Sequence, residues 1–286
     1  MSAIPPYQIV EPGADAPATP LVFASPHSGR VYPAEMLQAS ALDEQAIRRS
    51  EDAFVDQLIE AAALHGATLI TAQYARAYVD VNREPYELDP AMFADELPDY
   101  ARGRTARVAA GLGSIAKIVS EGQEIYARKL TFEEASARIE AAHKPYHAAL
   151  SALLDKTKDA HGIAVLIDWH SMPSAAAAQG RSGKGCDMVL GDRFGASCSA
   201  ALTRLVEQQF EAMGYRTVRN APYAGGYTTE HYGKPQKRVH ALQVEINRAL
   251  YLDEKTMRPT EGLKRLSRDI ERLTEALAAA DWGRLR

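Results

Sequence analysis

With 286 residues, the chain is long enough to form one large α/β domain. Its net charge is -4 at pH 7 and it has no basic stripe, which argues against a nucleic-acid partner. No stretch approaches the ~18 apolar residues that a membrane span needs, and the first residues lack the basic and apolar segments of a signal peptide. The two cysteines, Cys186 and Cys198, do not have the C-x-x-C spacing typical of zinc or redox sites. We therefore expect a cytoplasmic enzyme that acts on a small molecule and has no membrane partner.

The N-terminal part of the chain is predicted to combine short strands with one long helix. Residues 1–20 are rich in Pro, Ala and Gly and are expected to form a loosely held arm, so that residues 21–286 make a single domain. Apolar residues at three- and four-residue spacing between 41 and 65 predict a helix that begins near Asp43. The strands expected here are 21–24, 68–71 and an extended segment at 74–81.

The remainder of the chain alternates predicted helices and strands. Residues 86–114 mix Pro, Asp, Gly and Arg and are expected to form long functional loops. Thr131 and Glu134 match a capping box at the start of a helix predicted over 131–156. Further strands are expected at 163–167, 188–190, 215–218 and 239–246, and further helices at about 195–213 and 262–280. This alternation predicts an α/β fold with a mostly parallel or mixed sheet and helices on both faces.

Two of the predicted strands end at a histidine in a tight turn of small residues. The run 21–24 leads into Ser-Pro-His-Ser-Gly with His27, and the run 163–167 leads into Asp-Trp-His-Ser-Met-Pro with His170. Ligands of open α/β sheets bind where the strands end at their carboxyl edge, so these two imidazoles can meet there. A single histidine is more often a hydrogen-bonded structural residue, but a pair at two strand ends predicts a metal site.

Catalytic zinc usually takes three protein ligands and leaves one position for water. The third ligand is expected to be a carboxylate, and Glu51 and Asp52 on the first predicted helix are the best-placed candidates. The alternative is that they form a solvated acidic pair within Arg-Arg-Ser-Glu-Asp. The residue pattern alone leaves the choice between Glu51 and Asp52 open.

Glu245 is the candidate general base. It lies in an otherwise apolar predicted strand, where an unpaired carboxylate would cost several kcal/mol. A base that takes a proton from a metal-bound water and returns it to a leaving nitrogen is one use for such a group. The alternative is a buried ion pair with Arg248 or another arginine.

The segment 76–83 carries several polar side chains. If it is extended, one face presents Arg76, Tyr78, Asp80 and Asn82, and Arg83 stands at its end. Arginine binds carboxylates with a planar two-pronged fork, so Arg83 is predicted to anchor an acidic substrate. The alternative is a surface arginine paired with Glu84 or Glu87.

Three other histidines are candidates for the site. His143 and His147 share a helix face, but the pattern lacks the Glu of a His-Glu-x-x-His zinc helix, and neither is assigned a role. His231 lies in the glycine-bearing segment 224–233, which is typical of a lid or pocket wall, and is expected to contact substrate rather than metal.

Five motifs follow one another in an order and spacing that is specific in combination. They are Ser-Pro-His-Ser-Gly at 25–29, Asp-Val-Asn-Arg-Glu-Pro at 80–85, Asp-Trp-His-Ser-Met-Pro at 168–173, Gly-Gly-Tyr-Thr-Thr at 225–229 and Val-Glu-Ile-Asn-Arg at 244–248. From about residue 20 to about residue 275 the chain thereby resembles the N-formylglutamate amidohydrolase family. That family is related to the zinc carboxypeptidases, which implies a three-layer α/β/α sandwich with a mixed sheet of the phosphorylase/hydrolase-like kind.

The resemblance implies a metal-dependent hydrolase that converts N-formyl-L-glutamate to formate and L-glutamate during histidine degradation. It implies Glu245 as the base, and it implies that Asn82 and Arg83 hold the α-carboxylate, as an Asn-Arg pair does in carboxypeptidases. A second cation, Arg76 or Arg181, is expected to hold the side-chain carboxylate of the substrate.

The resemblance also implies His27 and His170 as ligands of one Zn²⁺, with one departure from the related peptidases. Carboxypeptidases take their first His and Glu from a His-x-x-Glu unit, whereas the residue three after His27 is Arg30. The carboxylate ligand must then come from elsewhere, and the resemblance favours Asp52 over Glu51.

Two rival functions are compatible with these residues. One is a zinc-dependent amidase or deacylase of another N-acylated amino acid, because family likeness determines chemistry better than substrate. The other is a non-catalytic binder of acidic metabolites. All three take a small acidic molecule as partner, and the sequence does not predict an oligomeric state.

Overall fold

The computed structural model describes residues 4–101, 103, 105–119, 122–178 and 185–285. Within them, a seven-stranded mixed sheet has the order β1-β3-β2-β4-β7-β5-β6. The strands β2, β4 and β7 run parallel to one another, β5 is antiparallel to β7, and β5 and β6 are parallel. The strands of this sheet are β1 (Tyr7–Val10), β2 (Leu21–Ser25), β3 (Thr68–Ala72), β4 (Ala164–Met172), β5 (Met188–Gly191), β6 (Thr217–Arg219) and β7 (Val239–Asn247). A separate pair consists of β8 (Leu252–Asp253) and β9 (Arg258–Pro259).

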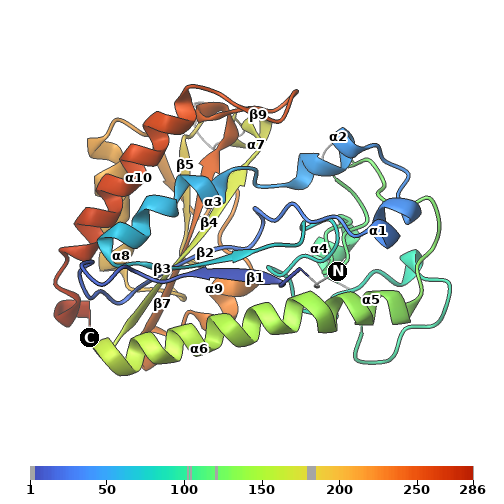
Figure 1. Ribbon diagram of the computed structural model, residues 1–286, viewed down its shortest axis with the longest axis horizontal. Coiled ribbons are helices and arrows are strands. Elements are labelled where there is room, and N and C mark those ends of the chain that lie inside the picture. Colours follow the sequence, from blue (N-terminus) through green and yellow to red (C-terminus); the bar gives the residue numbers. More distant parts are fainter. Residues whose placement is uncertain (1–3, 102, 104, 120–121, 179–184, 286) are drawn as a thin grey trace. The chain divides into compact units, whose positions relative to one another are not determined.

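Helices are interspersed with the strands along the whole chain (Figure 1). The α-helices of the described residues are α1 (Ala34–Ala39), α2 (Glu44–Ile47), α3 (Val55–Leu58), α4 (Ala106–Ala109), α5 (Phe132–Arg138), α6 (Lys144–His161), α7 (Ser174–Ala178), α8 (Ala200–Ala212), α9 (Tyr227–Tyr232) and α10 (Gly262–Ala278). Among them, none combines the length and the apolar composition that a membrane crossing requires.

The chain divides into two compact units. The first contains the residues up to Gln8, Pro26–Glu51 and Thr71–Ala149, and the second contains Ile9–Ser25, Asp52–Ile70 and the residues from Leu150 onward. The grouping of residues 21–286 into one domain stays a prediction. Within the expected N-terminal arm, Tyr7–Val10 forms the edge strand β1, so this part of residues 1–20 belongs to the sheet.

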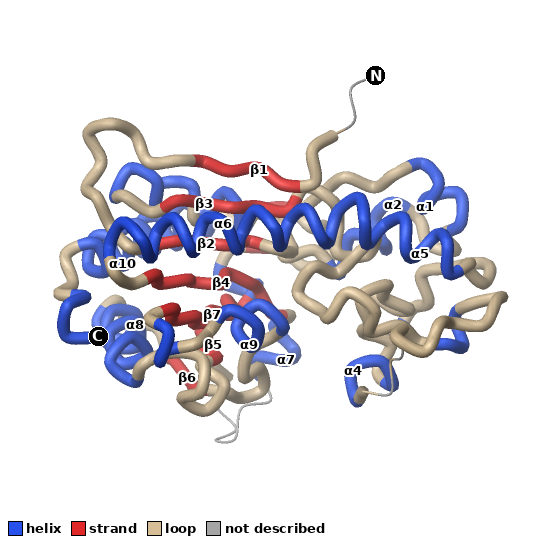
Figure 2. Tube along the Cα trace, turned by 90° about the horizontal axis from the view of Figure 1, so that it is seen from below, coloured by secondary structure: helices blue, strands red, loops and turns tan. Residues whose placement is uncertain are grey.

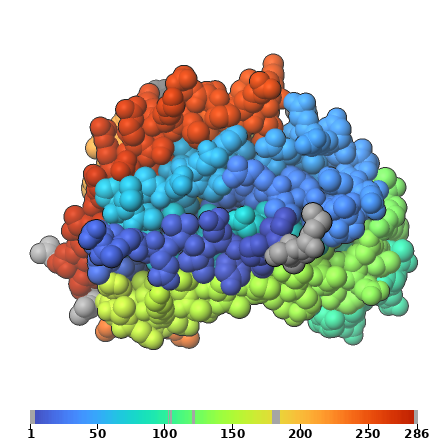
Figure 3. All heavy atoms as spheres, in the orientation of Figure 1, coloured from blue at the N-terminus to red at the C-terminus, as the bar shows by residue number. Residues whose placement is uncertain are grey.

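The second unit has helices on both faces of its strands, as predicted. Figure 2 shows α9 and the C-terminal part of α6 in front of the strands and α8 and α10 behind them. Along the surface, the chain that follows β1 runs beside the C-terminal part of α6 (Figure 3). There Lys156 Nζ lies 3.0 Å from Glu11 Oε1.

Because helices cover both faces of the strands in this unit, the prediction of a mixed sheet between helix layers is confirmed.

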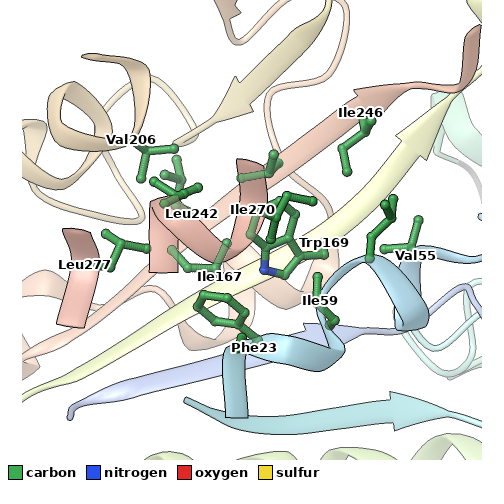
Figure 4. Close-up of a cluster of buried hydrophobic side chains, with 14 of the residues drawn as sticks. Phe23, Val55, Ile59, Ile167, Trp169, Val206, Leu242, Ile246, Ile270 and Leu277 are labelled. Carbon is green, nitrogen blue, oxygen red and sulfur yellow. The ribbon is translucent and has the colours of Figure 1, made fainter. Parts of the chain in front are cut away.

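The core of the second unit lies between the strands and α3, α8 and α10. On β4, Ile167 and Trp169 point to this side, and the ring of Trp169 packs 5.5 Å from that of Phe23, measured between centroids (Figure 4). The helix α10 contributes a stripe at four-, three- and four-residue spacing, made of Leu266, Ile270, Leu273 and Leu277. Because successive strand residues point to opposite faces, Asp168 and His170 point away from this core.

The first unit has its own core, built from loops and short helices. It includes Tyr78, Leu88 and Ile125, together with Ile139 at the end of α5. The predicted capping box at the start of α5 is present, because the Thr131 side chain accepts from the backbone of Glu134 and the Glu134 side chain from the backbone of Thr131. The five residues Ile139–His143 then form a π-turn that joins α5 to α6.

The prediction of one long helix from Asp43 to His65 is wrong, because the structure has several short helices there. Asp43 does cap α2, but the chain leaves the helix at Glu51, which has extended backbone angles, and Phe54 has a positive φ of 64°. The carboxylate of Glu51 is buried and accepts hydrogen bonds from Tyr32 Oη at 2.7 Å and from Arg48 Nε at 3.1 Å. These contacts of a buried charge outweigh helix propensity, which is worth only tenths of a kcal/mol per residue.

The extended segment predicted at 74–81 is also wrong. The backbone N–H of Tyr78 donates to the carbonyl of Ala75 at 2.8 Å, and that of Val79 donates to the same carbonyl at 3.3 Å, so the chain turns here. A turn places residues four apart next to each other rather than on one face of a strand. Arg76 consequently contacts Asp80.

Candidate metal centre and active site

The centre of the sheet in the second unit carries four polar side chains on one face. In the parallel pairing of β4 with β7, Asp168 lies opposite Gln243, and His170 lies opposite Glu245. All four are buried, with exposed fractions of 8% or less. Burying polar and charged groups in a sheet is costly unless they bind one another or a ligand. This face is therefore the candidate functional surface of the strands.

His170 stands among carboxylates. Its Nε2 lies 3.0 Å from Asp168 Oδ2, and its Nδ1 lies 3.1 Å from Asp52 Oδ2. Burial alone would lower the pKa of His170, but Asp168, Asp52 and Glu245 raise it well above its usual value. The carboxylates around this imidazole create an excess of negative charge, which a bound cation would offset.

Arg248, the alternative ion-pair partner proposed for Glu245, donates from Nη2 to Asp52 Oδ1 at 2.9 Å. Its Nε also donates to the hydroxyl of Ser171 at 3.1 Å. With the Asp52 side chain 1% exposed and that of Arg248 5% exposed, this is a buried ion pair. Such a pair fixes the orientation of the carboxylate, so Asp52 Oδ2 is directed towards His170.

Glu245 is held by a neighbour on its own strand. Gln243 Nε2 donates to Glu245 Oε1 at 2.8 Å, and Gln243 Oε1 accepts from the backbone N–H of Gly226 at 2.7 Å. Gly226 precedes α9, so one glutamine side chain connects the Glu245 carboxylate to the start of this helix. Gln243 is a functional residue that no sequence motif marks. Its only signal was its position two residues before Glu245, on the same side of the strand.

In the first unit, His27 is oriented by Asp80. His27 Nε2 lies 2.7 Å from Asp80 Oδ1, and Arg76 Nη2 donates to Asp80 Oδ2 at 2.7 Å. The backbone N–H of Asn82 adds a hydrogen bond of 2.9 Å to Asp80 Oδ1. Burial alone would raise the pKa of Asp80, but Arg76, His27 and Arg83 hold it well below its usual value. A carboxylate behind a histidine is the usual support of a metal ligand, a role of Asp80 that its place in the sequence does not reveal.

His27, Asp52 and His170 form a group that could hold a metal ion. All three are buried, and one ligand atom from each lies within 4.8 Å of the others. Two imidazoles and one carboxylate are a donor set that suits a catalytic divalent ion such as zinc. Glu51, the other candidate, uses its carboxylate to accept from Tyr32 and Arg48. The donors present thus fit the metal that the sequence analysis expected.

The residues predicted to bind substrate differ in burial and in partners. Asn82 is buried, whereas Arg83 is partly exposed. Arg83 donates from Nε to the carbonyl of Leu112 and from Nη1 to the carbonyl of Asn82, both at 2.9 Å. Arg76 lies against Asp80, as described above. Arg181 lies outside the described residues.

Comparison with models of protein families matches residues 19–252 to the N-formylglutamate amidohydrolase family. The chain belongs to this family. The match covers more than four fifths of the chain and includes each of the five motifs on which the resemblance depended. The resemblance inferred from the sequence is therefore confirmed.

Relatives of known name agree with this membership. The chain is 32% identical over 238 residues to an N-formylglutamate deformylase of Pseudomonas putida, covering 82% of each protein. It is 31% identical over 273 residues to an N-formylglutamate deformylase of Pseudomonas aeruginosa, covering 93% of this chain and 95% of the relative.

Solved structures support the same fold. The crystal structure of an N-formylglutamate amidohydrolase from Ralstonia eutropha JMP134 superposes with a TM-score of 0.90 at 36% identity, over 96% of this chain and 98% of that one. A gene product of Agrobacterium tumefaciens shares the fold alone, with a TM-score of 0.65 at 16% identity. The α/β architecture with a mixed sheet is thus the architecture of the family.

Proposed function

We propose that this enzyme hydrolyses the amide bond of N-formyl-L-glutamate and releases formate and L-glutamate. The observation that carries the proposal is the buried group of His27, Asp52 and His170 in a chain that belongs to the N-formylglutamate amidohydrolase family. Relatives that match most of the chain are named N-formylglutamate deformylases, which supports the same substrate.

His27, Asp52 and His170 would hold one divalent ion, which we propose is Zn²⁺. When bound, such an ion polarises the formyl carbonyl and lowers the pKa of a water molecule. Asp80 and Asp168 would keep the two imidazole rings oriented, because each carboxylate lies within 3.0 Å of a ring nitrogen.

Glu245 would act as the general base and then as the general acid. Its carboxylate takes a proton from the attacking water and passes it to the departing nitrogen of glutamate. The hydrogen bond from Gln243 Nε2 to Oε1 restrains the carboxylate, which supports its use as a positioned base. The pairing of Glu245 with His170 across β4 and β7 supports its assignment to the same site.

Asn82 and Arg83 would bind the α-carboxylate of the substrate. The hydrogen bonds from Arg83 to the carbonyls of Leu112 and Asn82 restrain the guanidinium, which reduces the entropy lost when it binds an anion. Arg76 and Arg181 remain the proposed cations for the side-chain carboxylate. Arg76 would serve in that role from its place beside Asp80.

The test is the release of formate from N-formyl-L-glutamate by the purified enzyme, before and after treatment with a chelator and after addition of Zn²⁺. We expect activity that chelation abolishes and zinc restores, with about one metal ion per chain. A panel of N-formyl, N-acetyl and N-succinyl amino acids measures the acyl preference. Faster release of acetate or succinate than of formate would contradict the proposed substrate, and activity that survives complete removal of metal would contradict the metal centre.

A further inference from the structure

Two histidines near the junction of α5 and α6 bind the backbone beside Asn82 and Arg83, the residues proposed to bind the α-carboxylate and called the substrate clamp below. His143 Nε2 lies 2.8 Å from the carbonyl oxygen of Arg83, and His147 Nε2 lies 2.6 Å from the carbonyl oxygen of Val81. A carbonyl oxygen only accepts, so each ring donates from Nε2. His143 is buried and His147 is partly buried, and their ring centroids are 4.5 Å apart.

The two histidines lie one helical turn apart, so their rings project from the same side of the helix. Residues four apart in an α-helix are separated by a rise of about 6 Å. The two histidines bind two carbonyls that lie two residues apart in a turn of the chain, those of Val81 and Arg83. His143 is the last residue of the π-turn Ile139–His143, and such turns in helices are frequently found at functional sites.

Every carbonyl from Val81 to Arg83 accepts a hydrogen bond from a side chain. His147 donates to Val81, Arg83 Nη1 donates to Asn82, and His143 donates to Arg83. In addition, the backbone N–H of Asn82 donates to Asp80 Oδ1. This segment belongs to neither a strand nor a helix, so its backbone depends on side chains for partners that regular structure would otherwise supply.

We propose that His143 and His147 are positioning residues that hold the backbone of residues 81–83 and thereby aim Asn82 and Arg83 at the α-carboxylate of the substrate. The inference rests on the proposed function, since it assigns these histidines to the binding of that carboxylate. A displacement of about 1 Å in a substrate-binding group can cost on the order of a hundredfold in rate, so two hydrogen bonds remote from the chemistry can govern how the substrate is held.

The experiment compares His143→Leu and His147→Leu with His143→Gln and His147→Gln. Leucine removes the donor, whereas glutamine carries an amide N–H at nearly the place of the imidazole Nε2. His161→Leu, in the last turn of α6, is the matched control. For each variant, kcat and KM are measured for N-formyl-L-glutamate and for its α-carboxamide, N-formyl-L-isoglutamine.

We expect each leucine variant to raise KM for N-formyl-L-glutamate about tenfold, with a smaller change in kcat, because a misplaced clamp weakens binding. The KM for the α-carboxamide should change far less, so that the ratio of the two KM values, which measures the preference for the acid, becomes smaller. The glutamine variants should restore most of the affinity, and His161→Leu should behave as the wild type does.

Equal losses on both substrates, or glutamine variants as impaired as the leucine variants, would overturn the proposal. If the leucine variants do not fold, His147→Asn decides the matter, because its amide is too short to reach Val81 but keeps a polar side chain. Wild-type KM in a folded His147→Asn enzyme would likewise overturn it. Failure of the proposed function is distinct, since the wild-type enzyme itself would then release no formate from N-formyl-L-glutamate.

Discussion

The substitution Glu245→Gln separates the chemistry of the proposed base from the stability of the fold. The amide that replaces the carboxylate can present its oxygen to Gln243 Nε2, so the hydrogen bond of 2.8 Å is retained. The side chain keeps its volume, and the apolar residues on the other face of β7 are unaffected. We therefore expect the melting temperature and the metal content to stay close to the wild-type values.

The same substitution removes the basicity of the side chain, because an amide does not accept a proton from water. Loss of a general base lowers turnover about 10² to 10⁴-fold. At 1.36 kcal/mol per factor of ten, this corresponds to a barrier raised by roughly 2.7 to 5.4 kcal/mol. The assay is formate release at saturating N-formyl-L-glutamate, combined with metal analysis of the same sample.

The matched control is Glu60→Gln, which makes the same chemical change at an exposed residue. This variant should have normal turnover. Turnover of Glu245→Gln within about threefold of wild type, with metal retained, would refute the role of Glu245 as the base. A Glu245→Gln enzyme that lost its metal would show that this carboxylate supports the metal centre, and the base would then have to be another group.

Three further predictions concern the supports of the site and the fold. Asp80→Asn should weaken the affinity for the metal about 10 to 100-fold, because it removes a carboxylate behind a histidine ligand. Competition with a chromogenic chelator measures this affinity, and an unchanged value would show that Asp80 does not support His27. Gln243→Met removes the donor to Glu245 and leaves the N–H of Gly226 without its acceptor. Steady-state kinetics should show a lower kcat, and urea denaturation should show a free energy of unfolding lower by about 1 to 3 kcal/mol. Leu273→Ala, on the buried stripe of α10, should lower the free energy of unfolding by about 2 to 5 kcal/mol but leave KM unchanged in the folded enzyme, and a change below about 1 kcal/mol would contradict its place in the core.

Local patterns were sufficient to predict the strands on which the site is built. The runs that precede His27 and lead to His170 are apolar on both faces, which is typical of buried parallel strands, and both are found as β2 and β4. The strand β4 continues to Met172, so His170 lies within the strand rather than after it. Glu245 was detectable because a carboxylate is out of place in an apolar run.

Patterns failed where a partner distant in sequence outweighs local preference. The helix expected from Asp43 to His65 is interrupted because the Glu51 carboxylate is buried against Tyr32 and Arg48. The signals of helix spacing are local and do not register such a contact. Asp80 was placed on the face of a strand that does not form, and its contact with His27 joins residues 53 apart.

The amino-acid sequence alone reveals the family, the three central strands β2, β4 and β7, the two histidines associated with strands, and the acid in an apolar strand. These depend on residue types and on short spacings, which the chain displays directly. The folded chain is needed to see that Asp80 and Asp168 lie against the two imidazoles and that Gln243 holds Glu245. It is also needed to see that His143 and His147 reach the backbone 60 and 66 residues before them. A hydrogen bond depends on the distance between its two atoms and not on their separation in the sequence, so local patterns do not reveal these contacts.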